Sequence, residues 1–196
     1  MLENIPYFSY ILSAFIGIGL ATATGFRVFL PMFAVSLASY FGWFSLGENF
    51  AWLQSLPALI ATGIATIIEI LAYYIPYIDH LLDTLSVPLA TVAGTLLFAS
   101  QFSDLGSFPI WALALIAGGG TAATISSGFA GGRAVSTAAT GGLGNSVVST
   151  TETFGATLMS FLALAFPIIA AIFAVVILFV ILFYGRKLWK SLETKS

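Results

Sequence analysis

The chain contains no cysteine and one histidine, and only 7% of its 196 residues are Asp, Glu, Lys or Arg. The missing thiols exclude disulfides, thiol catalysis and iron–sulfur ligation. The scarcity of charge excludes a soluble domain, because such domains carry about 25% charged residues. No basic stretch suited to binding nucleic acid is present, so a nucleic-acid partner is not expected.

The sequence is rich in long apolar segments. Hydrophobic residues make up 59% of the chain, and the mean hydropathy is +1.05. The apolar run over residues 160–185 exceeds the roughly 20 residues that span a bilayer. The first residues, "MLENIPYF", lack the positive region of a cleaved signal, so the first apolar segment is expected to stay in the protein. These features predict a single all-α integral membrane domain over residues 1–196, surrounded by lipid.

Breaks at glycine, proline and charged residues divide the apolar sequence into about seven short, partly broken helices. The predicted helices cover residues 8–25, 28–43, 57–75, 85–103, 109–126, 134–150 and 154–184. Three full spans plus two re-entrant hairpins would also make an odd number of crossings and would place the two termini on the same sides as seven crossings do. The predicted organisation is a first repeat unit at about 8–76, a connector and span at 77–107, a second repeat unit at about 108–185 and a tail at 186–196.

The positions of the charged residues predict an orientation. If the C-terminal tail is cytoplasmic, as the positive-inside tendency suggests, seven crossings place the N-terminus outside. All six Lys and Arg residues then fall on the inner side. The acidic residues predicted to lie outside are Glu3, Glu48, Asp104 and Glu152. We therefore predict a multi-pass protein with a cytoplasmic C-terminus.

Two segments suggest a weak internal repeat, "GLATATGFR" (19–27) and "GTAATISSGFAGGR" (120–133). Each is expected to form the glycine-rich turn of a helical hairpin with an arginine at its tip. The predicted turn glycines are Gly25, Gly128, Gly131 and Gly132. Paired hairpins are typical of duplicated transporter halves, although small residues also recur wherever membrane helices pack closely. The predicted crossings make the repeats parallel, and one miscounted helix would make them inverted.

The glycine-rich stretches do not match nucleotide-binding loops. "GFAGGRAV" lacks the Lys-Ser/Thr pair of a P-loop, and no βαβ unit surrounds "GGGTAA". No cofactor is therefore expected. The predicted helix 134–150 has almost no bulky side chain, so it should pack among other helices or beside a water-filled cavity. Its Asn145 needs polar partners, because unsatisfied polar groups cost several kcal/mol each in hydrocarbon.

Arg27, Arg133 and Glu69 are the main candidates for substrate binding, together with Asn145. A charged side chain inside a bilayer suggests function by default. An arginine at a glycine-rich turn could bind a carboxylate, a phosphate or a lipid headgroup, or it could snorkel to lipid phosphates and fix the topology. Glu69 is the one carboxylate well inside an apolar span, as either a proton-carrying acid or a structural counter-ion.

The segment "YIDHLLDTL" (77–85) reads as an amphipathic connector at the inner interface. On a helix, Asp79, His80 and Asp83 share one face, which makes them weak candidates for metal ligands. A solvated polar face with Asp at the helix N-terminus is the alternative. Without a nucleophile–base pair or a complete metal set, we expect no enzyme, and a metal-dependent intramembrane enzyme is the least favoured class.

Most of the chain resembles a bacterial family of integral membrane proteins named as a domain of unknown function (DUF4126). The likeness rests on "GLATATGFRVFLPMFAVSLASYFGW", on "EILAYYIPYIDHLLDTLSVPLATVAGTLL" and on the small-residue segment around Arg133. The Arg-x-Phe-x-Pro core of the family matches Arg27, Phe29 and Pro31, and its acid matches Glu69.

The family's Ile-Pro-x-x-Asp-His-x-x-Asp run matches residues 75–83. Tyr73 and Tyr74 stand where the family usually has an Asp-Lys pair, so this chain does not perform that pair's role in the same way. The resemblance implies a protein of the bacterial inner membrane and brings no established activity.

Together these features favour a small transporter or channel for a small anion or an anionic headgroup. In it, Arg27 and Arg133 face a central site. The alternative is a non-catalytic membrane protein, such as a scaffold, a lipid-organising factor or a partner subunit. Because seven short helices make a small body, a homo-oligomer is expected in either case.

Overall fold

The computed structural model describes residues 6–75, 78–102 and 108–193. In these residues the helices are α1 (Pro6–Phe26), α2 (Phe29–Tyr40), the 3-10 helix η1 (Glu48–Gln54), α3 (Leu56–Ala72), α4 (Ile78–Ala99), α5 (Phe108–Leu113), the π-helix η2 (Ala114–Gly119), α6 (Gly120–Thr140), α7 (Asn145–Ala165) and α8 (Pro167–Glu193). α5, η2 and α6 follow one another without a break. The described part of the chain contains no strand, which confirms the predicted all-α class.

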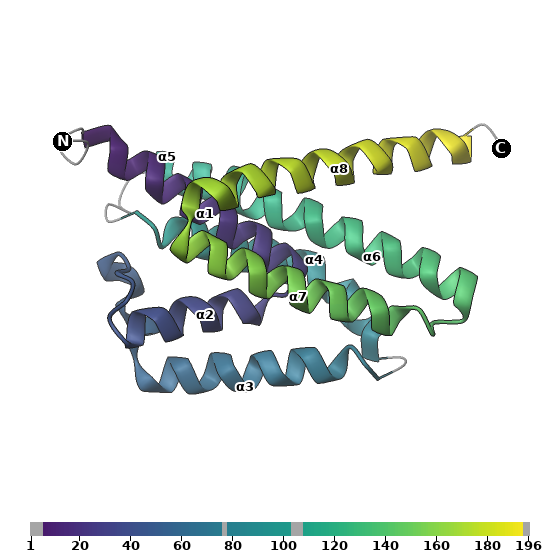
Figure 1. The fold of residues 1–196 in the computed structure, drawn as a ribbon, viewed down its shortest axis with the longest axis horizontal. Coiled ribbons are helices and arrows are strands. Elements are labelled where there is room, and N and C mark those ends of the chain that lie inside the picture. Colours follow the sequence, from purple (N-terminus) through teal and green to yellow (C-terminus); the bar gives the residue numbers. More distant parts are fainter. Residues whose placement is uncertain (1–5, 76–77, 103–107, 194–196) are drawn as a thin grey trace.

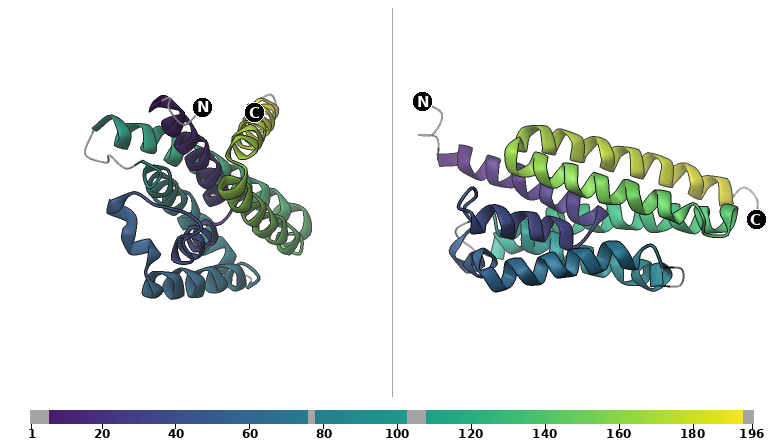
Figure 2. Two further views of the ribbon diagram at one scale, coloured as in Figure 1. Left: turned by 60° about the vertical axis from the view of Figure 1, so that its left-hand side comes forward. Right: turned by 60° about the horizontal axis from the view of Figure 1, so that its bottom comes forward.

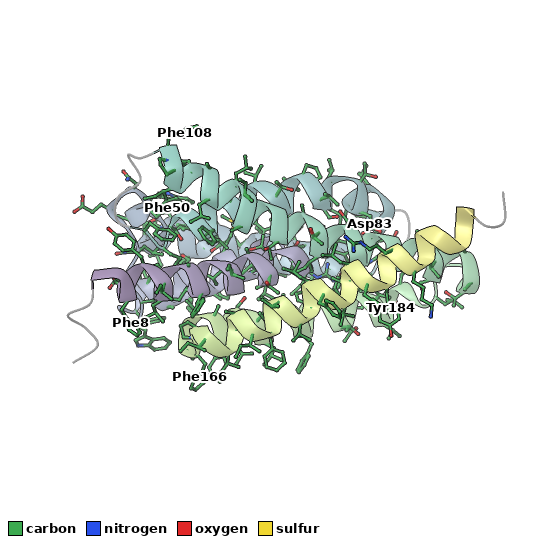
Figure 3. All side chains as sticks on the ribbon, turned by 90° about the horizontal axis from the view of Figure 1, so that it is seen from above. Phe8, Phe50, Asp83, Phe108, Phe166 and Tyr184 are labelled. Carbon is green, nitrogen blue, oxygen red and sulfur yellow. The ribbon has the colours of Figure 1, made fainter. Side chains whose placement is uncertain are left out.

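Five helical runs are long and apolar enough to cross a membrane: α1, α4, α5–η2–α6, α7 and α8. A sixth is possible if η1 and α3, which are bent by 68° relative to each other, form one broken span. α2 is apolar but has only 12 residues. The labelled Phe8, Phe108, Phe166 and Tyr184 are exposed on the outside of the bundle (Figure 3). The chain is therefore a multi-pass membrane protein.

α1 lies at the centre of the bundle and packs against α4, α6, α7 and α8 (Figure 1). α2 and α3 form a pair on one side of it, and α7 and α8 lie side by side on the other (Figure 2). α1 begins and α8 ends at opposite ends of the bundle (Figure 1).

The predicted boundaries of the last three helices are wrong. The expected turn at residues 128–133 lies inside α6, and Gly128, Gly131 and Gly132 are helical. The actual turn follows Thr140, where Gly141 and Gly142 have φ of 64° and 93°. Glycines within a membrane helix do not break it, because the backbone must keep its hydrogen bonds in lipid. Gly128 serves helix packing instead, since a Cβ there would lie 2.8 Å from Cγ2 of Ile181 in α8.

This shift moves two further predicted boundaries. α7 begins at Asn145 and ends at Ala165, and Pro167 starts α8, so the long apolar run contains a break. Nor is the segment 77–85 a separate interfacial connector, because its described residues from Ile78 onward form the first turns of α4.

The predicted repeat of arginine-tipped hairpins holds at Arg27 and fails at Arg133. Arg27 lies between α1 and α2, which reverse direction (Figure 1). Arg133 lies in the middle of α6. The two similar segments nevertheless pack together: a Cβ on Gly25 would lie 2.6 Å from Cβ of Ile125. Gly25 thus permits a close helix contact in the last turn of α1 and does not itself form the turn.

η2 and α4 also cross closely. A Cβ on Gly118 would lie 2.6 Å from the carbonyl oxygen of Gly94, and a Cβ on Gly94 would lie 3.0 Å from the carbonyl oxygen of Gly118. Such contact between helix backbones is what small residues permit in membranes, where packing and not the hydrophobic effect holds helices together.

Candidate functional site

Arg27 enters the bundle from the end of α1 and is fully buried, with 1% of its surface exposed. Its Nη2 donates to the carbonyl oxygen of Ser149 at 3.0 Å and to the Ser149 hydroxyl at 2.5 Å. Its Nε donates to Oγ1 of Thr153 at 3.3 Å. Ser149 and Thr153 are four residues apart on α7, so they share one helix face. The predicted site arginine is therefore fixed to a helix far away in sequence.

Arg133 is also buried and is held by two carboxylates. Its Nη1 pairs with Oδ1 of Asp83 in α4, and its Nη2 pairs with Oε2 of Glu152 in α7. Asp83 is labelled in Figure 3, where it lies among the helices of the bundle. Since α6, α4 and α7 each supply one member, this set of ion pairs links three helices.

Glu152 bridges the two predicted arginines. The same Oε2 that pairs with Arg133 lies 3.4 Å from Nη2 of Arg27. The prediction that Glu152 lies outside the membrane, away from both arginines, is therefore wrong. The cause is the misplaced helix boundary: because α7 begins at Asn145, Glu152 sits two turns inside that helix.

Tyr73, the residue after α3, contacts both arginines through its ring. The Cζ atoms of Arg27 and Arg133 each lie 4.0 Å from the ring centroid. The face of an aromatic ring attracts cations, and the attraction grows when the pair is removed from water. We call Arg27, Arg133, Glu152, Asp83 and Tyr73 the arginine cluster.

Glu69 lies beside the arginine cluster but binds backbone and not a guanidinium. Its two oxygens accept hydrogen bonds from the backbone N–H groups of Val28 at 2.8 Å and Phe29 at 3.0 Å. These are orphan donors at the start of α2, where the helix dipole also favours a negative charge. Among the described residues, Glu69 forms no ion pair with Arg27 or Arg133. It therefore fixes the chain immediately after Arg27.

Asn145 extends the polar interior toward the start of α4. Its Nδ2 donates to Oδ2 of Asp79 and to Oγ1 of Thr137, both at 3.0 Å. Asp79 is buried, and the side chain of Asp83 is only 17% exposed. The predicted solvated face of this segment is therefore wrong, because α4 turns both acids toward α6 and α7.

The structure does not assemble the three weak metal candidates into a site. Asp79 accepts a hydrogen bond from Asn145, and Asp83 pairs with Arg133. The side chain of His80 lies outside the described residues. Within the part of the chain that the structure describes, no group of three or more His, Asp or Glu side chains is placed to hold a metal ion.

A cavity of about 230 Å³ reaches the arginine cluster from the side of α3 and α4. Its lining includes Glu69, Tyr73 and Ser86. Tyr73 thus has the cavity on one side and both guanidinium groups in contact with its ring. Two guanidinium nitrogens, Nη1 of Arg27 and Nε of Arg133, are buried and have no hydrogen-bond partner among the residues that the structure describes.

The charges of the arginine cluster balance. Two guanidinium groups face two carboxylates, those of Glu152 and Asp83, in a region with little access to water. Burying an unpaired charge is far more costly than burying a pair. The cluster can therefore accept an external anion only when one of its own carboxylates loses its charge or moves away.

The residues that sequence reasoning missed are Glu152, Tyr73, Ser149 and Thr153. Their spacing carried a signal, since Ser149, Glu152 and Thr153 fall on one face of a helix that begins earlier than predicted. The asparagine after "TGGLG" marks that beginning, because Gly-Gly suits a helix C-terminus that turns into the left-handed region.

No curated protein and no solved structure matches the chain. One family model does match, and it covers residues 14–187. That range includes the arginine cluster, Glu69 and Asn145 and leaves out only the two ends of the chain. The chain belongs to the family described as Domain of unknown function (DUF4126).

Proposed function

We propose that the protein is a small membrane transporter for a small anion, with Arg27 and Arg133 as the anion-binding groups. The observation that carries this proposal is that one carboxylate oxygen, Oε2 of Glu152, contacts both guanidinium groups. A carboxylate is itself an anion, so in the described state the arginine pair holds an anion that belongs to the protein.

Protonation of Glu152 would release the arginine pair for an external anion. The groups that face Glu152 are Arg27 from α1 and Arg133 from α6, and Asp83 of α4 holds the other side of Arg133. Within the arginine cluster itself, a neutral Glu152 leaves one carboxylate, that of Asp83, opposite two guanidinium groups. A monovalent anion restores the balance, so one proton and one anion would enter together without a change in the charge of the cluster.

The cavity beside Glu69 and Tyr73 is the proposed entry. Tyr73 stands between this cavity and the arginines, so movement of its ring would open the route. Glu69 would keep its negative charge at the start of α2 and so keep Arg27 in place. In this proposal the C-terminus is cytoplasmic, the membrane is the bacterial inner membrane, and copies of the chain associate.

Flux into proteoliposomes tests the proposal. We expect a pH gradient, acidic outside, to drive uptake of chloride, phosphate or a small monocarboxylate by the wild-type protein. Arg27→Ala and Arg133→Ala should abolish it. Glu152→Gln, which carries no proton to exchange, should bind the anion but lose the response to the gradient. Glu48→Gln, at an exposed position, is the matched control. A demonstrated flux that both arginine variants leave unchanged would show that the site is wrong.

A second candidate is a membrane scaffold or partner subunit in which the arginine cluster stabilises the fold and binds no external anion. The observation in its favour is that both arginines are already paired and buried. This candidate gains if the wild-type protein moves none of these anions at any gradient while the cluster variants unfold more readily.

A further inference from the structure

A groove runs between α6 and α8, and its lining includes no member of the arginine cluster. The two helices touch where Gly128 faces Ile181, and they diverge from there toward the C-terminal end of α8 (Figure 1). The groove has a volume of about 810 Å³. Ligand sites typically measure about 300–1,000 Å³, so it is large enough for a bound molecule.

Glycines of α6 make the floor of this groove. A Cβ added to Gly131 or Gly132 would meet no atom of the described residues within 4 Å, so the backbone there is open to a bound molecule. The walls are apolar, with Val135 on α6 and Val180 and Leu182 on α8. A groove of this kind suits a flexible hydrocarbon chain.

One end of the groove is cationic. Arg186 lines it, and both Arg186 and the next residue, Lys187, are exposed. Arg186, Lys187, Lys190 and Lys195 are four of the six basic residues in the chain, and all of them follow residue 185. The apolar groove therefore ends beside the greatest concentration of positive charge in the sequence.

We propose that this groove binds an anionic phospholipid. One acyl chain would lie along Gly131 and Gly132 between the two helices, and the phosphate would pair with the guanidinium of Arg186. Basic pockets between membrane helices at the headgroup level are typical sites for anionic lipids. This site is separate from the arginine cluster, so it stands or falls independently of the proposed transport.

The charge at Arg186 argues against a second copy of the chain as the occupant. Copies in one membrane have the same orientation, and a symmetric pair brings the same patch of each copy together. Arg186 and Lys187 of one copy would then face the same residues of the other. An anionic headgroup at this position meets opposite charge instead.

Lipid retention during native mass spectrometry tests the proposal on the purified full-length protein. With equal amounts of phosphatidylglycerol and phosphatidylcholine, the wild-type protein should retain phosphatidylglycerol preferentially. Arg186→Gln should reduce that preference by about fivefold, the factor that corresponds to about 1 kcal/mol for one basic residue near an anionic surface. Gly131→Leu should reduce the retention of both lipids, because its side chain fills the groove.

Gly120→Leu is the matched control, because Gly120 lies on the same helix outside the groove and a Cβ there also meets no atom of the described part of the chain within 4 Å. It should retain lipid as the wild type does. Phosphatidylglycerol with a photoreactive acyl chain should label peptides from residues 124–135 and 180–185, a readout that needs no variant.

Three results would overturn the proposal: an unchanged lipid preference in Arg186→Gln, labelling elsewhere in the chain, or a wild-type dimer that Gly131→Leu converts to monomer. The last result would assign the groove to a second copy.

Discussion

Glu152 and the two arginines that it contacts depend on one another. Taking an ion out of water costs several kcal/mol, and the attraction between partners offsets that cost only when the geometry is complete. Here one oxygen serves two guanidinium groups, while Ser149 and Thr153 on the same helix hold Arg27. Loss of any one member leaves a buried charge behind.

We predict that Glu152→Ala lowers the free energy of unfolding by about 3–5 kcal/mol, the range for a buried ion pair that loses one partner. Chemical denaturation in detergent measures this difference. Glu48→Ala is the control, since an exposed residue of η1 should change stability by no more than about 0.5 kcal/mol. Equal stability of the two variants would contradict the ion-pair network.

The sequence made Arg27, Arg133 and Glu69 the main candidates for substrate binding because charge is so rare in an apolar chain. It did not identify their partners. Glu69, predicted as either a proton-carrying acid or a structural counter-ion, accepts hydrogen bonds from the backbone of Val28 and Phe29. Which acid meets which base depends on the relative rotation of helices that are distant in sequence, and local patterns contain no information about that rotation.

Helix boundaries decided which parts of the fold could be predicted. The first three predicted helices lie close to α1, α2 and α3, because Arg27 separates the first two and a segment with two glycines, Glu48 and Pro57 separates the last two. In the second half, eight glycines from residue 118 to residue 142 offered several possible breaks. Glycine marks a turn in water but also marks close packing in a membrane, so its presence alone did not locate the turn.

Two glycines distinguish these roles experimentally. Gly141 has φ of 64°, a conformation that costs other residues about 1–2 kcal/mol. Gly141→Ala should therefore lower stability by roughly that amount. Gly131→Ala, inside α6 with open space around it, should leave stability unchanged or raise it. Thermal unfolding of both variants checks the boundary, and the reverse order would restore the turn to residues 128–133.

The crossing of η2 and α4 makes a second prediction at this scale. Gly118→Ala should lower the free energy of unfolding by about 1–3 kcal/mol, because its Cβ forces apart two backbones in contact. Gly120→Ala places the same methyl group two residues away in open space and is the control. If both substitutions have the same effect, the two helices do not cross as described.

At the scale of the whole molecule, the described structure has as many α-helical runs as the sequence predicts, although the boundaries of the last three predicted helices are wrong. The breaks predicted near residues 130 and 152 were replaced by breaks at residues 141–144 and 166. The start of α1 and the end of α8 lie at opposite ends of the bundle (Figure 1). The relative placement of the two chain ends depends only on the number of helical segments. The residues that meet at the candidate site depend on where each of those segments begins.

The absence of cysteine makes this topology directly testable. Ser45→Cys lies in the exposed segment after α2, and Leu143→Cys lies in the exposed turn before α7. These two segments lie at opposite ends of the bundle (Figure 1). In intact cells, an impermeant maleimide should label Ser45→Cys and should label Leu143→Cys only after lysis. Labelling of both residues from one side would contradict the arrangement of the helices.

The long sequence separation within the arginine cluster has a consequence for biosynthesis. Arg27 and Ser149 are 122 residues apart. At about 5–20 residues per second, roughly 6–24 seconds pass between the synthesis of the arginine and that of the helix that binds it. During this interval the nascent chain holds an uncompensated guanidinium near the translocon. A message truncated before α7 should therefore yield a product that the cell's membrane quality control removes.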